Sequence, residues 1–238
     1  MNLPISNRLL ACCGYVRTGD RVADIGCDHG YLGIYLLREG IARSVIASDV
    51  NEQPLQAAMA NAARYGVNAN ITFYLSNGVR NIPRDFDCLV CAGMGADTMI
   101  SILEAAPWLK VSRYRLILQC QSRRPALRQW LNQAGFTVRR ETLAQDGKFL
   151  YPVLEAVYAP VPRLRPGEEV ISPALLASRS PLLPAFYERV RAGVTQTIAG
   201  LEHTQNAGRL AQYRATLAAL TEMEEQIYGN RSGNPEQA

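Results

Sequence analysis

Histidine and lysine are almost absent from this chain. Its 238 residues include two histidines and two lysines, so 23 of the 25 cationic side chains are arginines. Two histidines offer little help to a metal site, and the cysteines do not follow a metal-ligand spacing. Cys88 and Cys91 form an isolated C-x-x-C within an apolar run, which favours buried free thiols over a redox site. We therefore expect no metal, and we interpret Cys12, Cys13 and Cys120 as packing residues.

Long apolar runs are also missing. No segment approaches the roughly 18–20 apolar residues of a membrane span, and residues 1–8 lack the apolar centre of a signal peptide. We expect a cytosolic protein, not associated with a membrane, whose packed core draws on the 48% of residues that are hydrophobic. The net charge is +4, and residues 1–162 carry the excess, with 17 Lys and Arg against 13 Asp and Glu. Arginine suits bidentate phosphate contacts, although genome composition can equally explain its use.

Residues 20–50 contain the most informative pattern. Residues 21–26 predict a short buried strand that stops at a glycine, residues 27–30 a polar turn, and residues 31–39 a helix. A second apolar strand at 44–47 then leads to Asp49. This order is typical of the first half of a nucleotide-binding α/β domain.

Further strands and helices alternate up to residue 133. The sequence predicts a leading helix at 2–14, helices at 52–65, 98–105 and 125–133, and strands at 71–75, 87–91 and 114–118. Two strand-like runs at 136–142 and 149–158, separated by little more than Asp146-Gly147, predict an antiparallel hairpin. Five parallel strands closed by a hairpin match the Rossmann-like, seven-stranded α/β sheet of class I methyltransferases. An NAD-binding half-sheet would continue with further crossovers.

The remainder of the chain has a different pattern. Prolines punctuate the segment after residue 159, and apolar residues then recur at spacings of three and four in two stretches separated near residue 207. This predicts a small α-helical hairpin of coiled-coil type. The predicted divisions are a methyltransferase domain at 1–160, a linker at 161–180, the helical hairpin at 181–230 and a flexible tail at 231–238.

The turn after the first predicted strand has the composition of a ligand site. Gly26 lets a ligand approach the backbone, and the next helix presents free N–H groups to an anion. A G-x-G-x-x-G dinucleotide site would have glycine where Asp28 stands, and this carboxylate would repel a pyrophosphate. S-adenosylmethionine has no phosphate and carries cationic groups that Asp24 or Asp28 can face. The predicted cofactor contacts in this turn are Asp24, Gly26, Cys27, Asp28, His29 and Gly30, although a purely structural histidine is an equal alternative.

Two later strand ends complete the predicted cofactor site. Asp49 is placed to accept both ribose hydroxyls, and the alternative is a helix N-cap for the segment from Glu52. Asn77 and Gly78 would lie beside the adenine, unless they form an ordinary Asn-Gly turn. Val50, which follows Asp49, belongs to the same predicted site.

The acceptor is expected at the ends of the fourth and fifth strands. Residues 92–95, Ala-Gly-Met-Gly, would let a flat base lie against the backbone, and a simple tight turn is the alternative. Gln119 and Gln121 can pair with a base edge, or they lie in a solvated loop. The predicted catalytic residues are Asp28, Gly93, Met94, Gly95 and Gln119, and Gly93 is also expected to contact the cofactor.

Four stretches together resemble one family. They are Asp-Ile-Gly-Cys-Asp-His-Gly-Tyr-Leu at 24–32, Ala-Gly-Met-Gly-Ala at 92–96, Leu-Ile-Leu-Gln at 116–119 and Asp-Gly-Lys-Phe-Leu-Tyr at 146–151. These motifs resemble the bacterial tRNA adenine-N1 methyltransferases of the TrmK type, and the resemblance extends over essentially the whole chain. It implies an S-adenosylmethionine-dependent enzyme that methylates N1 of the adenine at position 22 in the D-arm of tRNA. The chain departs from the family pattern at Gly30, Asn77 and Ala96, where alanine, aspartate and glycine are usual.

If the partner is tRNA, the excess of arginines can be explained by contacts with its phosphates. We expect phosphate contacts, with a solvated surface as the alternative, from Arg8, Arg17, Arg80, Arg84, Arg123 and Arg124. The helical hairpin is a possible second clamp, and a monomer or a weak dimer is expected. Three other hypotheses remain open: a class I methyltransferase with another acceptor, an NAD-linked oxidoreductase, and a non-catalytic RNA-binding protein with a decayed pocket.

Overall fold

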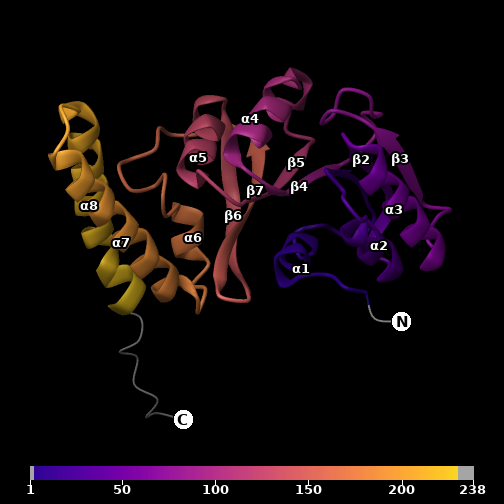
Figure 1. Cartoon of the computed structure of the whole chain (residues 1–238), viewed down its shortest axis with the longest axis horizontal. Coiled ribbons are helices and arrows are strands. Elements are labelled where there is room, and N and C mark those ends of the chain that lie inside the picture. The colour runs from indigo at the N-terminus through magenta and orange to yellow at the C-terminus, as the bar shows by residue number, and fades with distance from the viewer. Residues whose placement is uncertain (1–2, 230–238) are drawn as a thin grey trace, which may run out of the picture. The chain divides into compact units, whose positions relative to one another are not determined.

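The computed structural model describes residues 3–229, and its ribbon is drawn in Figure 1. The chain divides into two compact units between Pro162 and Arg163. The predicted tail at 231–238 lies outside the described residues. No helix in the described part of the chain has both the length and the apolar character needed to cross a membrane.

The first unit is built around one seven-stranded sheet. Its strands are β1 (Asp20–Ile25), β2 (Ala42–Asp49), β3 (Ile71–Leu75), β4 (Cys88–Met94), β5 (Arg115–Cys120), β6 (Phe136–Asp146) and β7 (Phe149–Tyr158). Their order in the sheet is β3-β2-β1-β4-β5-β7-β6. Neighbours among β1 to β5 are parallel, whereas β7 is antiparallel to both β5 and β6. The predicted sheet of five parallel strands closed by a hairpin is confirmed.

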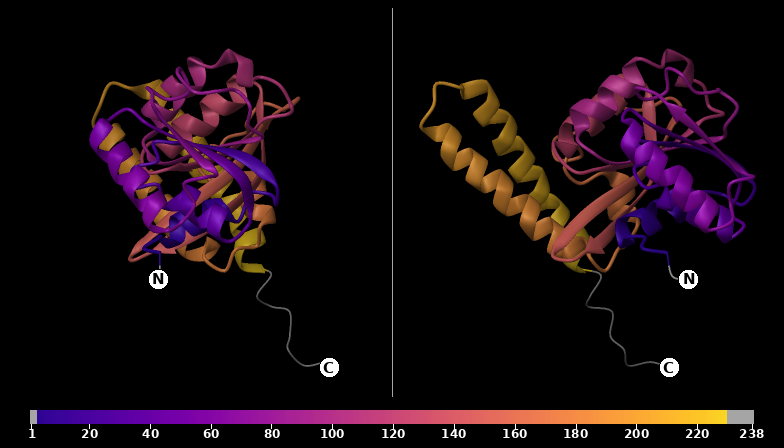
Figure 2. Two further views of the ribbon diagram at one scale, coloured as in Figure 1. Left: turned by 90° about the vertical axis from the view of Figure 1, so that its right-hand side faces the viewer. Right: turned by 45° about the vertical axis from the view of Figure 1, so that its right-hand side comes forward.

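Helices cover both faces of this sheet, as Figures 1 and 2 show. They are α1 (Asn7–Cys13), α2 (Tyr31–Arg38), α3 (Glu52–Arg64), α4 (Ala96–Glu104), the 3-10 turn η1 (Pro107–Leu109) and α5 (Arg124–Gln133). One buried apolar cluster includes residues of α1, α2 and α3, and a second includes residues of α4 and α5. Cys88 belongs to the first cluster and Cys91 to the second, so the C-x-x-C pair is split between the two faces of β4.

The closing hairpin is longer than its sequence pattern predicts. Strand β6 continues to Asp146, which pairs with Phe149 across the tip. Only Gly147 and Lys148 remain for the turn, and Gly147 has the positive φ of 56° that such tight turns require. Helix α1 packs against β6, and Figure 1 shows the tip of the hairpin beside this helix.

The second unit contains the helices α6 (Pro173–Ala177), α7 (Leu183–Glu202) and α8 (Ala207–Tyr228). Helices α7 and α8 pack together, with the rings of Tyr187 and Tyr228 5.9 Å apart. The stretch expected as a linker at 161–180 is partly folded: the Ser172 hydroxyl caps α6, and Leu175 within it is fully buried. Pro173 at the first helical position starts this short helix instead of breaking the chain.

Candidate active site

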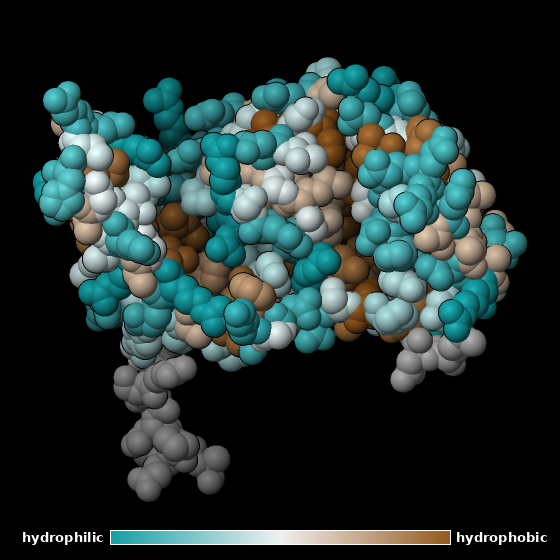
Figure 3. Space-filling view, in the orientation of Figure 1, coloured by the Kyte–Doolittle hydropathy of each residue, from teal (hydrophilic) through white to brown (hydrophobic). Residues whose placement is uncertain are grey.

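A cavity of about 350 Å³ opens where the parallel strands end. Its walls come from the carboxyl ends of β1, β2 and β4, from the loop after β3, and from α1, α2 and α4. In Figure 3 hydrophobic residues gather in a seam between the surface over α4 and that over α2 and α3, framed by hydrophilic residues. The cavity therefore lies where open α/β sheets bind their ligands.

Most of the predicted site residues line this cavity. They are Arg8, Asp24, Gly26, Cys27, Asp28, His29, Asp49, Val50, Asn77, Gly78, Gly93 and Met94. Segments more than 80 residues apart in the sequence thus meet at one edge of the sheet.

Asp24 is the most perturbed acid in the cavity. It ends β1 with a 4% exposed side chain, and its Oδ2 has no hydrogen-bond partner among the described residues. Burial raises the pKa of Asp24 to about 7; a backbone hydrogen bond from Gly33 opposes this shift, and the charge of Asp49 adds to it. An unpartnered buried carboxylate oxygen is costly, and a cationic hydrogen-bond donor on a ligand would relieve the cost.

Asp49 shapes the turn after β1 from the neighbouring strand. Its Oδ2 accepts a hydrogen bond from the backbone N–H of Asp28 at 3.2 Å, and its Oδ1 accepts one from Asn51 at 3.0 Å. A carboxylate has about four acceptor positions, so capacity remains for ligand hydroxyls. Asn51, not Asp49, occupies the N-cap position of α3.

Gly26 gives the turn room for a methionine. Its φ is 71°, and a Cβ built at this position would lie 2.1 Å from Cε of Met94. Met94 ends β4, and its Sδ lies 3.4 Å from Sγ of Cys91. Any side chain at position 26 would therefore force the end of the Met94 side chain to move, and would be strained by the positive φ.

The loop after β3 is organised by a serine that the sequence analysis did not single out. Ser76 is buried, and its hydroxyl donates to the carbonyl of Gly78 at 2.9 Å and accepts from the N–H of Asn81 at 3.1 Å. Gly78 has a φ of 63°, and a Cβ there would meet Ile102 of α4 at 2.9 Å. This loop fixes Asn77 on the cavity wall.

Gln119 corrects one expectation. It was predicted to meet the acceptor base, yet its side chain is fully buried and is absent from the cavity wall. Its Oε1 accepts hydrogen bonds from Nη1 of Arg8 at 3.2 Å and from the N–H of Gly93 at 3.0 Å. Gln119 thus lies behind the cavity wall and positions Arg8 and Gly93 on it by hydrogen bonds.

Two predicted glycines also lie outside the cavity wall. Gly30 turns the chain into α2 with a φ of 73°, and a Cβ there would lie 3.0 Å from Cβ of Ala58. Gly95 precedes α4, and a Cβ there would lie 2.8 Å from the hydroxyl of Ser122. Gly30 thus packs closely against α3 and Gly95 against the loop after β5, and this packing accounts for both glycines.

Asp28 and His29 reach the open side of the cavity. Their side chains are 72% and 54% exposed, and Nε2 of His29 lies 3.7 Å from Oδ1 of Asp28. Asp28 adopts a φ of 49°, a left-handed conformation that aspartate tolerates better than most residues. Its carboxylate is therefore available to a ligand or to an incoming acceptor.

The predicted RNA-binding arginines do not form one patch. Arg8 lines the cavity, Arg123 pairs with Asp97 at 2.6 Å, and Nη1 of Arg124 donates to the carbonyl of Leu150 at 3.3 Å. Arg80, which is exposed, follows the Asn77-Gly78 turn. Arg84 stacks on Trp108, with its guanidinium 4.7 Å from the ring centroid, and Arg17 lies at the amino edge of the sheet.

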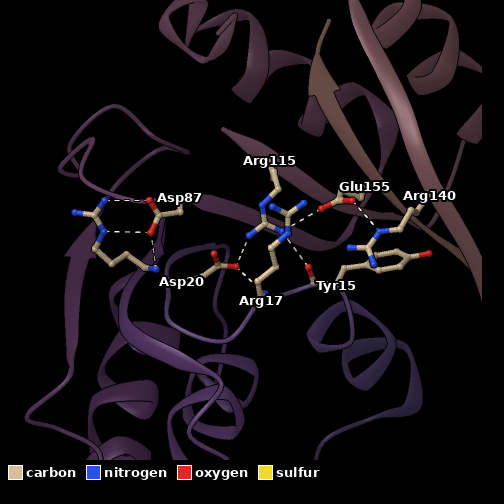
Figure 4. Close-up of polar contacts among 8 residues, drawn as sticks. Tyr15, Arg17, Asp20, Asp87, Arg115, Arg140 and Glu155 are labelled. Carbon is tan, nitrogen blue, oxygen red and sulfur yellow. Dashed lines mark hydrogen bonds and ion pairs between the residues drawn. The ribbon is translucent and has the colours of Figure 1, made fainter. Parts of the chain in front are cut away.

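That amino edge holds a second polar cluster, drawn in Figure 4. Buried Arg115 pairs with Asp20 and with Glu155, the latter at 3.0 Å, and also donates to the carbonyl of Tyr15 at 3.1 Å. Arg140 bonds to the other oxygen of Glu155 at 2.8 Å. Burial acts to raise the pKa of Glu155, but the bonds from Arg140 and Arg115 outweigh it and hold the pKa below its usual range. This cluster ties β1, β5, β6 and β7 to the residues after α1.

Eight further residues line the wall that were not predicted as contacts, although Ile25, Tyr31, Leu32 and Ala92 lie within the two strongest motifs. The eight are Leu9, Ile25, Tyr31, Leu32, Ser76, Ala92, Thr98 and Ile102. Most are apolar, and a sequence pattern assigns such residues to the core, because it does not show which core residues also border a cavity.

The seven-stranded sheet with its closing hairpin, and the acidic cavity at the carboxyl edge, define a class I methyltransferase fold. A family model described as a methyltransferase domain matches residues 5–154, and the chain belongs to this family.

Relatives refine this assignment. The chain is 30% identical over 155 residues to the tRNA (adenine(22)-N(1))-methyltransferase of Bacillus subtilis, and the match spans 65% of each protein, just under two thirds. It is also similar to the crystal structure of a Streptococcus pneumoniae protein assigned as a candidate tRNA (m1A22) methyltransferase. That likeness has a TM-score of 0.81 and 27% identity, and it covers 94% of this chain and 100% of the other. A second structure of the Streptococcus pneumoniae protein, in complex with S-adenosyl-L-methionine, has a TM-score of 0.78 to this chain at the same identity and coverage. The resemblance predicted from the motifs is confirmed.

Proposed function

We propose that this chain transfers the methyl group of S-adenosylmethionine to N1 of the adenine at position 22 of tRNA. The observation that carries the donor half is the buried, unpartnered Oδ2 of Asp24 on the wall of an acidic cavity. The acceptor half is supported by the named Bacillus subtilis relative and by the Streptococcus pneumoniae structure.

The residues present fit this cofactor. Within residues 3–229 the Asp24 Oδ2 has no hydrogen-bond donor, and the ammonium of the cofactor's methionine part would supply one that is also cationic. Asp49 retains acceptor capacity that two ribose hydroxyls would use, and Asn77 on the cavity wall would meet the adenine. When bound, the cofactor supplies a methyl group on a positively charged sulfur. The Streptococcus pneumoniae protein of the same fold was crystallised in complex with S-adenosyl-L-methionine.

The acceptor needs alignment more than activation. Adenine N1 is a neutral nucleophile with an in-plane lone pair, so the enzyme does not require a strong base. It must hold N1 about 3–3.5 Å from the methyl carbon and in line with the sulfur. Gly93 has a φ of 86° and lines the cavity, and a Cβ there would lie 3.2 Å from Nη1 of Arg8, so a flat base at the end of β4 would meet the backbone beside this guanidinium. The exposed Asp28 carboxylate is our candidate for stabilising the positive charge of the methylated ring.

A base within tRNA must leave its tertiary contacts before it can enter the cavity, at a cost of a few kcal/mol. Phosphate contacts from arginines at this edge of the sheet would offset that cost, and Arg80 and Arg123 are exposed there. A tRNA substrate also implies a cytoplasmic location. We further propose that the protein works as a monomer or a weak dimer.

Incubation with unfractionated tRNA and a labelled methyl donor, followed by nucleoside analysis, tests this function. The expected product is 1-methyladenine, mapped to position 22 by primer extension. Asp24→Asn is the matched control, because it removes the charge that the donor site requires and keeps the shape of the side chain. Label on another nucleoside, or on a protein added in place of tRNA, would reassign the acceptor and leave the donor site standing. No labelled product with any acceptor would contradict the whole assignment.

A further inference from the structure

The tip of the β6–β7 hairpin carries an exposed aromatic surface that the proposed reaction leaves without a role. Phe149 is 52% exposed, whereas Phe86, Phe136 and Phe186 are buried. Its ring centroid lies 6.1 Å from that of Tyr151, two residues further along β7. Nζ of Lys148 lies over the Phe149 ring, 5.4 Å from its centroid. Two aromatic rings and a cation thus share the end of one hairpin.

Strand register places these rings on the face of the sheet that α1 covers. Asp146 pairs directly with Phe149, and residues directly opposite in an antiparallel pair point to the same face. The Asp146 carboxylate lies 3.9 Å from Nε of Arg8 in α1. Val153, which shares the strand face of Tyr151, packs in the same buried cluster as Cys12 of α1. Phe149 therefore points to the same face as Val153, but α1 does not cover it, and its ring remains exposed.

A continuous set of contacts joins the hairpin tip to the cavity. Nδ2 of Asn7 donates to the carbonyl of Gln145 at 3.0 Å, which fixes the tip against α1. Arg8 reaches from Asp146 to Gln119, and Gln119 accepts from the N–H of Gly93 on the cavity wall. These contacts hold the hairpin tip beside Arg8, which lines the cavity.

We propose that Phe149 and Tyr151 form a stacking platform for an unpaired base of the RNA next to the base that enters the cavity. The inference rests on the function proposed above and adds the part of the substrate that this hairpin recognises. An aromatic face accepts any base, and a nearby cation favours the attached phosphate, which is the combination that binds single-stranded nucleic acid. Removing a base from its stack leaves its neighbour with one face bare, and a protein ring can cover it. Among the exposed large hydrophobic residues of the described chain, Phe149 has an aromatic ring with a cation over one of its faces.

Binding measurements with purified tRNA test the platform. Phe149→Ala should weaken tRNA affinity about 10- to 100-fold, the effect of losing one base–aromatic stack. S-adenosylmethionine affinity should stay unchanged, because Phe149 does not line the cavity. Phe149→Tyr should retain most of the affinity. Val111→Ala, at another hydrophobic residue that is 44% exposed, is the matched control and should bind tRNA as the wild type does.

A fluorescence readout separates stacking from a merely structural role. The indole introduced by Phe149→Trp should be quenched when tRNA binds, beyond any change from Trp108 and Trp130 in the unmodified protein. Wild-type tRNA affinity in Phe149→Ala, or an indole that tRNA does not quench, would overturn the platform. A change in self-association without a change in tRNA affinity would also overturn it and assign the surface to a second copy of the chain. A wild-type protein that binds tRNA without methylating it would instead contradict the proposed reaction; the platform is judged by tRNA binding alone and would not be affected by that result.

Discussion

Asp24→Asn should raise the stability of the cofactor-free protein near neutral pH and lower its affinity for S-adenosylmethionine. The wild-type carboxyl is 4% exposed, and one of its oxygens has no partner among the described residues, so its charge is poorly compensated until a ligand arrives. Asparagine has nearly the same shape and carries no charge. The variant therefore separates the cost of the buried charge from the packing around it.

The size of the effect follows from the pKa of Asp24. Burial raises this pKa from 3.8 to about 7, a difference of about three units. Between these two values the folded protein holds a proton that the unfolded chain has released. The free energy of unfolding therefore falls by about 1.4 kcal/mol for each pH unit in this range, and by about 4 kcal/mol in total. The contribution is fully present below pH 3.8 and has been lost once the pH has risen through about 7.

Urea unfolding of both proteins without cofactor, from pH 4 to pH 8, measures this effect. The amide has its own hydrogen-bonding cost, but that cost does not depend on pH. The difference in unfolding free energy between Asp24→Asn and wild type should therefore grow in favour of the variant up to about pH 7 and then level off. Asp28→Asn is the matched control, because it neutralises a side chain that is 72% exposed.

The same variant should bind S-adenosylmethionine about 10- to 100-fold more weakly, since a charge-assisted hydrogen bond contributes about 1.5–3 kcal/mol. A stability difference that stays constant with pH would refute the assignment of a raised pKa to Asp24. Unchanged cofactor affinity would refute its role as the partner of the ammonium group.

Substitutions at three further positions test other parts of the structure. Asp28→Asn should lower kcat and leave tRNA affinity nearly intact, as single-turnover assays and filter binding can show; Asp28→Ala should in addition lose about 1 kcal/mol of stability because of its positive φ of 49°. Gly26→Ala should displace Met94 and weaken cofactor binding in calorimetry, and wild-type affinity would mean that this turn can adapt. Glu155→Gln leaves Arg115 partly unpaired and should cost about 3–5 kcal/mol in urea unfolding at pH 7. Because the pKa of Glu155 is lowered in the folded protein, this cost should shrink as the pH falls below 4.5, the opposite direction to the effect of Asp24.

The sheet was predictable from the sequence because its signals are local. Short apolar runs that stop at glycine or aspartate mark the parallel strands, and Asp146-Gly147 marks the hairpin. The helix boundaries were less certain: α1 begins at Asn7, five residues after its predicted start. The segment at 161–180 was misjudged because prolines punctuate linkers and also start helices such as α6.

The candidate site was only partly predictable, for a related reason. The strand ends identify Asp24, Asp49 and Asn77, since topology alone brings the carboxyl ends of parallel strands together. Topology does not say whether a side chain at a strand end faces the cavity or turns away from it. Gln119 turns away, and Gly95 faces a serine of the next loop. Such differences depend on side-chain packing between loops, which a single sequence does not encode in any local pattern.

Two buried polar atoms near the cavity have different roles: one can bind a ligand, and the other belongs to a side chain that positions its neighbours. Oδ2 of Asp24 and Nε2 of Gln119 both lack partners among the described residues, although each costs folding free energy. The Asp24 oxygen lies on the cavity wall, so a ligand can satisfy it directly. Gln119 lies behind the wall, and its Oε1 already holds Arg8 and Gly93. Gln119 therefore acts by positioning Arg8 and Gly93. Gln119→Leu, which removes these bonds, should lower the rate of tRNA methylation in single-turnover assays and leave the affinity for the methyl donor in calorimetry nearly unchanged.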